Sequence, residues 1–116
     1  MTDIQQLTQA ILQFRDERDW EQYHNGKDLA LCLSIEASEL LELFLWKQPE
    51  EVPEDRLKDE LADVIYSAFL LAAQYKFDIK EIVLDKLEKN IIIARFPRPP
   101  GYEDDRNQPL SFLAPE

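Results

Sequence analysis

Apolar residues recur at spacings of three and four along four segments of the chain, which is the spacing of an α-helix. We predict helices over about 4–20, 27–46, 53–75 and 78–94. Turn residues at 24–26 and prolines at 49 and 53 separate the first three segments. No stretch alternates apolar and polar residues as a strand does. The pattern therefore predicts an all-α fold, an antiparallel four-helix bundle with short connections.

Polar residues at the predicted helix starts indicate where two helices begin. Asp28 is the expected N-cap of the second helix. Asp78 is the expected N-cap of the fourth helix, with Glu81 three residues later as its capping-box partner.

The last twenty residues differ from the rest in composition. Five of the seven prolines fall there, and helix cannot continue through them (Pro97, Pro99, Pro100, Pro109 and Pro115). We predict a helical domain over 1–96 and a proline-rich C-terminal extension over 97–116.

The two central helices are apolar around most of their circumference. Leucines and a phenylalanine fill 40–45 except at Glu42, and apolar residues dominate 64–71. A helix of this kind requires burial on nearly all sides, which four helices of one chain do not supply. We therefore expect the chain to form a homo-oligomer.

The charge balance excludes several classes of partner. The chain has 24 acidic against 13 basic residues, a formal net charge of −11. It lacks the basic excess that binds nucleic acid or an anionic membrane surface. With two glycines it has no dinucleotide-binding fingerprint and no P-loop. The single cysteine, Cys32, excludes an internal disulfide framework and is expected to be buried as a small apolar residue.

Targeting signals are not evident. The first residues form neither a basic nor an apolar segment, so we expect no signal peptide. The longest apolar-leaning run, 29–46, contains three glutamates and does not resemble a membrane span. We expect a cytoplasmic protein.

Two pairs of acids provide the candidate chemistry. Glu36 and Glu39 stand three apart on the second predicted helix, and Glu60 and Asp63 stand three apart on the third, so each pair shares one helix face. Both pairs lie within apolar sequence, where unpartnered carboxylates are costly. One such pair is usually a solvated face, but two pairs on neighbouring antiparallel helices favour a site for a hard divalent cation. We expect Mg²⁺, with Mn²⁺ as a substitute.

A di-iron centre is the rival metal site. It requires Glu-x-x-His motifs on two helices. The chain has one histidine, so it contains one such motif at most, over 21–24. The count excludes a di-iron bundle.

Three sequence blocks, 15–24, 36–46 and 59–64, closely resemble the MazG-like all-α nucleoside triphosphate pyrophosphohydrolases. The similarity covers about residues 5–97, and the dCTP pyrophosphatases look like the nearest branch. The resemblance implies hydrolysis between the α- and β-phosphates of a deoxynucleoside triphosphate, dCTP or a modified dCTP. The products are a monophosphate and pyrophosphate, and the role is removal of unwanted nucleotides from the cellular pool.

The same resemblance implies roles for nine residues. The four paired acids match the family's Mg²⁺ ligands and catalytic groups, with Glu39 as a candidate general base. Five others match substrate-binding positions: Trp20, His24 and Trp46 for the base and sugar, Lys86 and Asn90 for the phosphates. The resemblance also implies a dimer, or a tetramer of two dimers.

The chain departs from the dCTP branch at two positions near the proposed site. Ser67 stands where that branch has a tyrosine, and Tyr66 stands one step earlier. Ile11 stands where the first helix often has a histidine.

Two alternatives to a dCTP pyrophosphatase remain open at this point. One is a non-enzymatic helical interaction module whose acids hold a structural cation. The other is an enzyme of the same family that acts on dUTP or on a wider range of nucleoside triphosphates.

Overall fold

The computed structural model describes residues 1–95, with side chains up to residue 92. This part of the chain is helical and contains no strand, which confirms the all-α prediction. The elements are α1 (Asp3–Glu17), η1 (Glu21–Tyr23), α2 (Gly26–Glu42), η2 (Pro49–Glu51), α3 (Glu54–Gln74) and α4 (Ile79–Arg95). The predicted extension, 97–116, lies outside the described residues. Over residues 1–95, none of the helices combines the length and apolar character that a membrane span requires.

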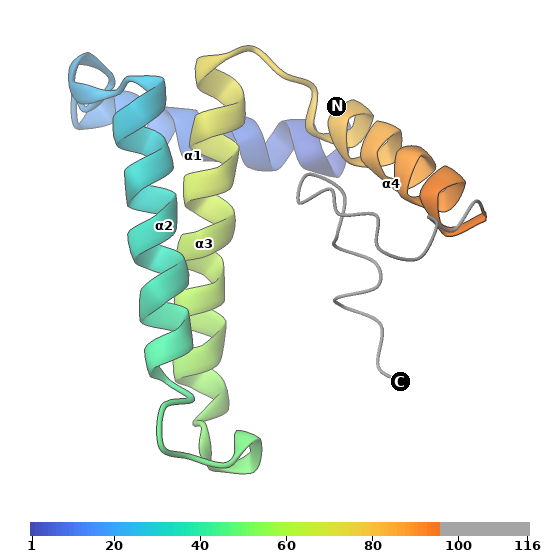
Figure 1. Cartoon of the computed structure of the whole chain (residues 1–116). Helices are drawn as coiled ribbons and strands as arrows, with labels where there is room; N and C mark the ends of the chain where they lie inside the picture. The colour runs from blue at the N-terminus through green and yellow to red at the C-terminus, as the bar shows by residue number, and fades with distance from the viewer. Residues whose placement is uncertain (96–116) are drawn as a thin grey trace. The chain divides into compact units, whose positions relative to one another are not determined.

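The chain divides into two compact units, Met1–Ile79 and the residues from Lys80 onward. In the first unit α2 and α3 run antiparallel, side by side, and α1 crosses them (Figure 1). A Cβ added at Gly26 would overlap the Tyr75 hydroxyl, so the start of α2 meets the end of α3. The described part of the second unit is α4, which begins directly after Asp78 as predicted.

Helices α1 and α3 end in the same local motif. After α1, the N–H groups of Asp19 and Trp20 donate to the carbonyls of Asp16 and Arg15. After α3, Lys76 and Phe77 donate to Ala73 and Ala72 in the same way. Asp19 and Lys76 both have a φ of 56°, as the Schellman motif requires of its left-handed residue. This motif ends α1 at Glu17, three residues before the predicted end.

The start and the end of α2 also differ from the sequence predictions. Asn25, not Asp28, is the N-cap, and its side-chain oxygen accepts a 2.9 Å bond from the Asp28 N–H. The helix ends at Glu42, not Trp46, because the chain then continues in turns closed by shorter-range bonds, such as that from the Phe44 N–H to the Leu41 carbonyl. Trp46 itself has a left-handed φ of 62°.

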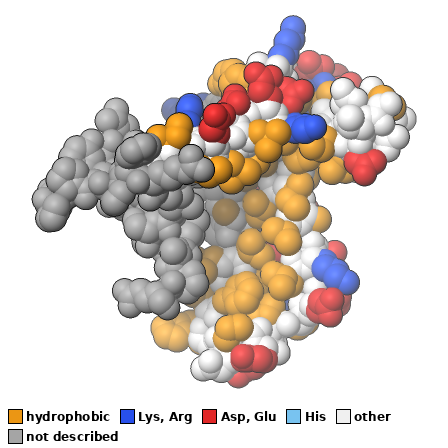
Figure 2. Space-filling model, turned by 90° about the vertical axis from the view of Figure 1, so that its right-hand side faces the viewer, with side chains coloured by type: hydrophobic (Ala, Val, Ile, Leu, Met, Phe, Trp, Pro, Cys, Tyr) orange, Lys and Arg blue, Asp and Glu red, His pale blue; other side chains and the backbone are white. Residues whose placement is uncertain are grey.

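The core of the first unit is small. Ile11, Leu29 and Leu70 form its buried centre, with Tyr66 and Phe69 packed against it. Many large apolar side chains remain exposed on a single chain (Figure 2). Cys32 is also exposed, so the prediction of a buried cysteine is wrong. Cys32 stands one helical turn before Glu36 on α2, so its exposure was not evident from helical periodicity.

Candidate metal centre

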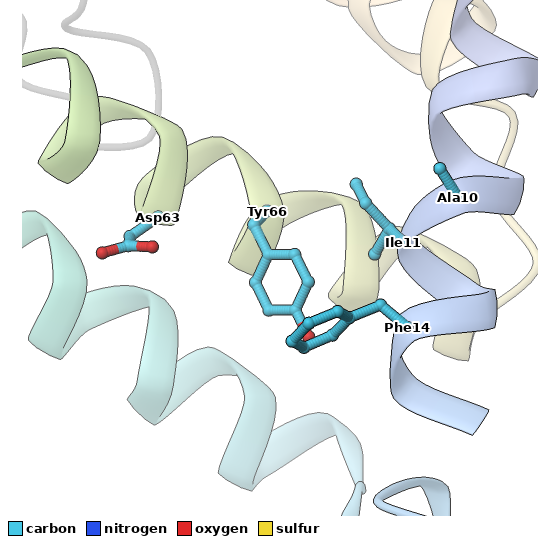
Figure 3. Close-up of a pocket in the computed structure, with 5 residues that line it drawn as sticks. All are labelled: Ala10, Ile11, Phe14, Asp63 and Tyr66. Atoms are coloured by element: carbon cyan, nitrogen blue, oxygen red, sulfur yellow. The ribbon is translucent and has the colours of Figure 1, made fainter. Parts of the chain in front are cut away.

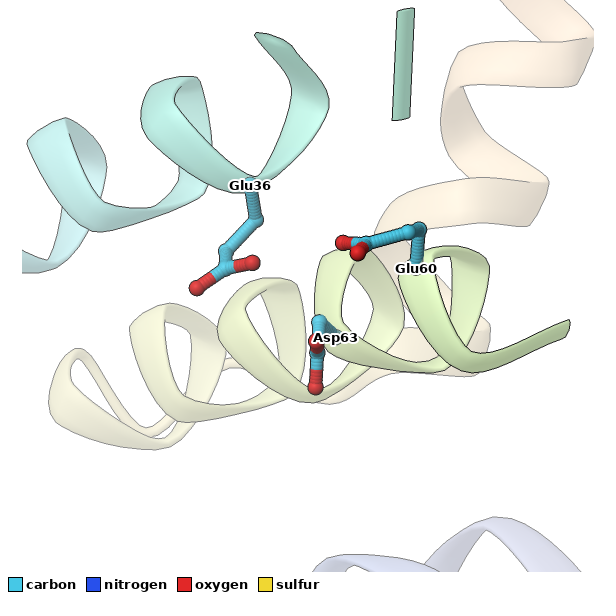
Figure 4. Close-up of side chains that lie close together, drawn as sticks. All are labelled: Glu36, Glu60 and Asp63. Carbon is cyan, nitrogen blue, oxygen red and sulfur yellow. The ribbon is translucent and has the colours of Figure 1, made fainter. Parts of the chain in front are cut away.

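Three of the four predicted acids converge between α2 and α3. Glu36 on α2, with Glu60 and Asp63 on α3, each offer one carboxylate oxygen, and these oxygens all lie within 4.8 Å of one another. Figure 4 shows the side chain of Glu36 extending from α2 toward the two acids of α3. The antiparallel pairing of the helices brings together residues that are far apart in the sequence.

This arrangement is electrostatically unfavourable by itself. Burial raises the pKa of the Glu36 carboxyl, and a side-chain hydrogen bond with Glu39 and the nearby negative charges raise it further. Two unit charges about 4 Å apart repel by roughly 4 kcal/mol at an effective dielectric constant of about 20. A cation bound among these carboxylates would therefore offset their mutual repulsion.

Two oxygens in the cluster also have no partner. The Oε2 atoms of Glu36 and Glu60 are buried and receive no hydrogen bond from the described residues. Buried polar atoms are rarely left unpaired in native proteins. A set of donors consisting only of carboxylate oxygens suits a hard divalent cation such as Mg²⁺. The residues present thus fit the metal that the sequence predicts.

Glu39 lies beside this cluster and not within it. It follows Glu36 by one helical turn, is partly buried, and interacts with Glu36 through a side-chain hydrogen bond and through its charge. It is not a member of the group of three acids whose oxygens converge. Its place next to Glu36 leaves it available for a role other than direct coordination.

A pocket of about 330 Å³ adjoins the metal centre. It is lined by Ala10, Ile11 and Phe14 of α1 and by Asp63 and Tyr66 of α3 (Figure 3). Asp63 belongs both to the pocket and to the acidic cluster, so a ligand in the pocket would have one end beside the carboxylates. Asp63 is the charged residue of this lining, and the other four side chains are aliphatic or aromatic.

The Schellman motif after α1 positions Trp20. It turns the chain back so that the indole meets the ring of Phe14 edge to face, with centroids 5.7 Å apart. Phe14 in turn meets Tyr66 edge to face at 6.1 Å. Trp20 is therefore linked to the pocket through one aromatic ring, and the Arg18 guanidinium lies over Phe14, 3.5 Å from the ring centroid.

His24 lies between η1 and α2 and is partly buried. Burial lowers the pKa of its imidazole, and the charge of Arg15 lowers it further, against a smaller opposite effect of Glu21. The ring is therefore neutral near pH 7 and able to donate one hydrogen bond and accept another.

The other predicted substrate residues lie elsewhere. Trp46 is completely exposed in the connection between α2 and η2. Lys86 and Asn90 stand one turn apart on α4, with Lys86 exposed and Asn90 partly buried. That helix belongs to the second unit, so the two residues are described within α4 only.

The residues that line the pocket, apart from Asp63, were not predicted as site residues. Ile11 and Phe14 are part of the apolar stripe of the first helix, and such a stripe usually indicates core packing. Two signals in the sequence were available. Tyr66 stands three residues after Asp63, and residues three apart share a helix face. The comparison with the dCTP branch also singled out Tyr66 and Ile11 as lying at positions near the proposed site.

Comparisons with known proteins agree with this architecture. Two proteins named dCTP pyrophosphatase 1, from Bos taurus and Homo sapiens, are each 37% identical over 95 residues, covering 75% of this chain and 56% of their own length. This chain thus spans little more than half the length of these relatives. The crystal structure of a pyrophosphatase from Archaeoglobus fulgidus matches with a TM-score of 0.75 and 32% identity, over 84% of this chain and 95% of that one.

The family comparison covers both helices of the acidic cluster. The model of the MazG-like family matches residues 31–95, more than half of the chain. This range contains Glu36, Glu60 and Asp63 together with Lys86 and Asn90. By sequence and by fold, the chain belongs to the MazG-like family.

Proposed function

We propose that this chain is a Mg²⁺-dependent nucleoside triphosphate pyrophosphohydrolase that converts a deoxynucleoside triphosphate to its monophosphate and pyrophosphate. One observation carries the proposal: three converging carboxylates stand beside a pocket of ligand size, and two of them have a buried oxygen without a partner among the described residues. The names of the mammalian relatives favour dCTP, or a modified dCTP, as the substrate. The proposed role is removal of such nucleotides from the cellular pool.

The proposed mechanism assigns one task to each group of residues. Glu36, Glu60 and Asp63 would hold Mg²⁺, which when bound neutralises phosphate charge and makes water a better nucleophile. Glu39 accepts a proton from the water that attacks the α-phosphorus. The new P–O bond forms as the bond between the α-phosphorus and the bridging oxygen breaks, and pyrophosphate leaves with that electron pair.

The remaining substrate residues bind and orient the nucleotide in this proposal. Trp20, His24 and Trp46 contact the base and sugar, and Lys86 and Asn90 contact the phosphates. Their roles rest on the match of these positions to substrate-binding positions of the family.

We further propose that the protein works as a homo-oligomer, a dimer or a tetramer of two dimers. Apolar side chains at helical spacing are exposed on α2 (Leu31, Ile35) and on α3 (Leu61, Ile65). A second copy of the chain would remove this surface from water.

The decisive experiment measures pyrophosphate and single phosphate separately for a panel of nucleoside triphosphates with Mg²⁺. We expect pyrophosphate release that stops when EDTA is added. Asp63→Asn should reduce turnover by about a hundredfold or more, because the oxygen set that binds the cation is incomplete. Asp55→Asn, an exposed aspartate in the first turn of α3, is the matched control and should retain the wild-type rate.

Two outcomes would contradict the proposal. If wild-type protein released no pyrophosphate from any nucleotide, the chain would be better described as an interaction module with a structural cation. If Asp63→Asn retained the wild-type rate with Mg²⁺, the acidic cluster would not be the catalytic centre.

A further inference from the structure

Arg15 differs from the other charged residues of the described chain because it is buried. Only 9% of the residue is exposed, although it lies in the last turn of α1, next to the connection to η1. Arginine is almost never buried in proteins unless its charge is paired. The proposed mechanism assigns no task to this charge, so its partners indicate what it does.

The Arg15 guanidinium pairs with acids on both sides of the end of α1. Its Nε and Nη2 atoms each lie 2.8 Å from Oδ1 of Asp16, which belongs to the same helix. Its Nη2 atom also lies 3.6 Å from Oε2 of Glu21, the first residue of η1. One side chain therefore connects the last turn of α1 to the turn that follows the helix.

The backbone of Arg15 is attached to the same connection. Its carbonyl accepts hydrogen bonds from the N–H groups of Arg18 at 3.2 Å and Trp20 at 3.1 Å. Further along, the His24 N–H donates to the Glu21 carbonyl at 3.0 Å. Segment 18–24, which carries two of the proposed substrate residues, is thus attached to Arg15 through both its main chain and a side chain.

The charge of Arg15 also acts on groups beyond its ion pairs. After burial, it is the next cause that lowers the pKa of the His24 imidazole. It acts on the phenol of Tyr66 as well, a residue of α3 that lines the pocket. The guanidinium is therefore within electrostatic range of both segment 18–24 and a residue of the pocket. Because it is buried and paired with acids, it suits contacts with protein groups and not with a ligand.

We propose that Arg15 is a positioning residue, whose buried guanidinium fixes segment 18–24 in the conformation that binds the nucleotide. This inference rests on the proposed function, since it takes Trp20 and His24 to contact the base and sugar. A segment that is already ordered loses less conformational freedom when a ligand binds. Arg15 therefore affects substrate binding and leaves the chemical step unchanged.

The kinetic test compares KM and kcat in the wild type, Arg15→Met and Glu21→Gln, with the best substrate of the nucleotide panel. Methionine replaces the apolar stem of the arginine without its charge, and the backbone carbonyl remains. An ion pair with one exposed partner is worth roughly a factor of five at most, so we expect KM to rise roughly threefold to fivefold in each variant, with kcat unchanged. The double variant should be no worse than either single variant, because both changes remove the same contact.

Two further variants serve as controls. Lys58→Met breaks an exposed ion pair with Glu54 on α3, in which the two atoms are 3.4 Å apart, and should leave KM and kcat unchanged. Arg15→Lys keeps the positive charge but loses the planar fork that pairs with two carboxylates at once. Its KM should lie between those of the wild type and Arg15→Met.

Two measurements test the same role without substrate. The N–H groups of Trp20 and His24 should exchange faster with deuterium in Arg15→Met, whereas exchange in the middle of α3 should not change. In NMR titrations, Arg15→Met should raise the pKa of His24, because the Arg15 charge lowers it. Glu21→Gln should lower that pKa, because the Glu21 charge raises it.

The outcomes separate this inference from the proposed function. Wild-type protein that hydrolyses no nucleotide overturns the proposed function, and the exchange and titration measurements then decide by themselves whether Arg15 fixes segment 18–24. If the wild type is active, an unchanged KM in Arg15→Met overturns the inference, whatever the value of kcat. A lower melting temperature with uniformly faster exchange would also overturn it, since Arg15 would then be a packing residue.

Discussion

Glu36 and His24 are both titratable and partly buried, yet burial moves their pKa values in opposite directions. Removal from water disfavours the charged form of each group, so the pKa of the glutamate rises and the pKa of the histidine falls. For Glu36 the neighbouring carboxylates act in the same direction as burial. For His24 the charge of Arg15 does so. The first unit thus contains a carboxyl group and an imidazole whose charged forms are both disfavoured by their surroundings.

The lowered pKa of His24 predicts how stability depends on pH. The folded protein favours the neutral ring, so this contribution to the free energy of unfolding is present above the unfolded value, about 6.5. It is lost as the pH falls through the lower folded pKa. We expect the imidazole NMR signal, which belongs to the one histidine of the chain, to titrate with a pKa below that of a model peptide.

Melting temperatures provide the control for this prediction. In His24→Gln the fall in melting temperature between about pH 7 and pH 5 should be smaller than in the wild type. A folded-state pKa above the model-peptide value would contradict the described environment of the ring.

At the scale of the helices, local hydrogen bonds decide where the elements begin and end. Thr2 caps α1 through a capping box with Gln5, in which each side chain bonds the other residue's backbone N–H. Asn25 caps α2. The Schellman motifs then direct the chain back over the helices they terminate, and the first of them places Trp20 against Phe14. The position of Trp20 is thus a consequence of helix termination.

The Asn25 cap should contribute measurably to stability. Loss of an N-cap side chain typically costs about 1 kcal/mol, so we expect Asn25→Ala to lower the free energy of unfolding by roughly that amount in urea titrations. Asn25→Ser retains an oxygen acceptor for the N–H of Asp28 and should stay close to the wild type. Equal stability of the alanine and serine variants would show that the cap contributes nothing.

At the scale of the whole molecule, the balance of buried and exposed apolar surface is the main feature. Few large side chains are buried in a single chain over the described residues, while Leu31 is 58% exposed and Ile35 48% exposed on α2. Contiguous apolar patches of this kind commonly mark protein–protein contacts. They support the proposed homo-oligomer, which would account for central helices that are more apolar than one chain requires.

Substitution on the exposed face of α2 tests the oligomer. We expect Leu31→Glu to shift the wild-type oligomer toward monomer in sedimentation velocity experiments, because it would bury a charge at the interface. Leu7→Glu introduces the same charge at a leucine of similar exposure on α1 and should leave the assembly intact. A wild-type protein that sediments as a monomer at all concentrations would refute the proposed assembly.

The sequence by itself determined the helical class, the approximate position of the four helices and the pairing of the acids. These features depend on short-range regularities, since a residue and its neighbours three and four positions away share one helix face. The same regularities carry the resemblance to the MazG-like family, because its acidic motifs are pairs of residues three apart. The predicted helix ends were less accurate. Helices α1 and α2 end at Glu17 and Glu42, earlier than predicted, because several local hydrogen-bonding patterns compete at a helix end.

The tertiary structure alone decided which acids converge and which groups are left without partners. It placed Glu36 with Glu60 and Asp63, put Glu39 beside them, exposed Cys32 and buried the Tyr66 hydroxyl without a hydrogen-bond partner among the described residues. Each of these properties depends on how another helix packs nearby. Exclusion of water and the meeting of charges are set by contacts between residues distant in the chain, and helical periodicity carries no information about those contacts.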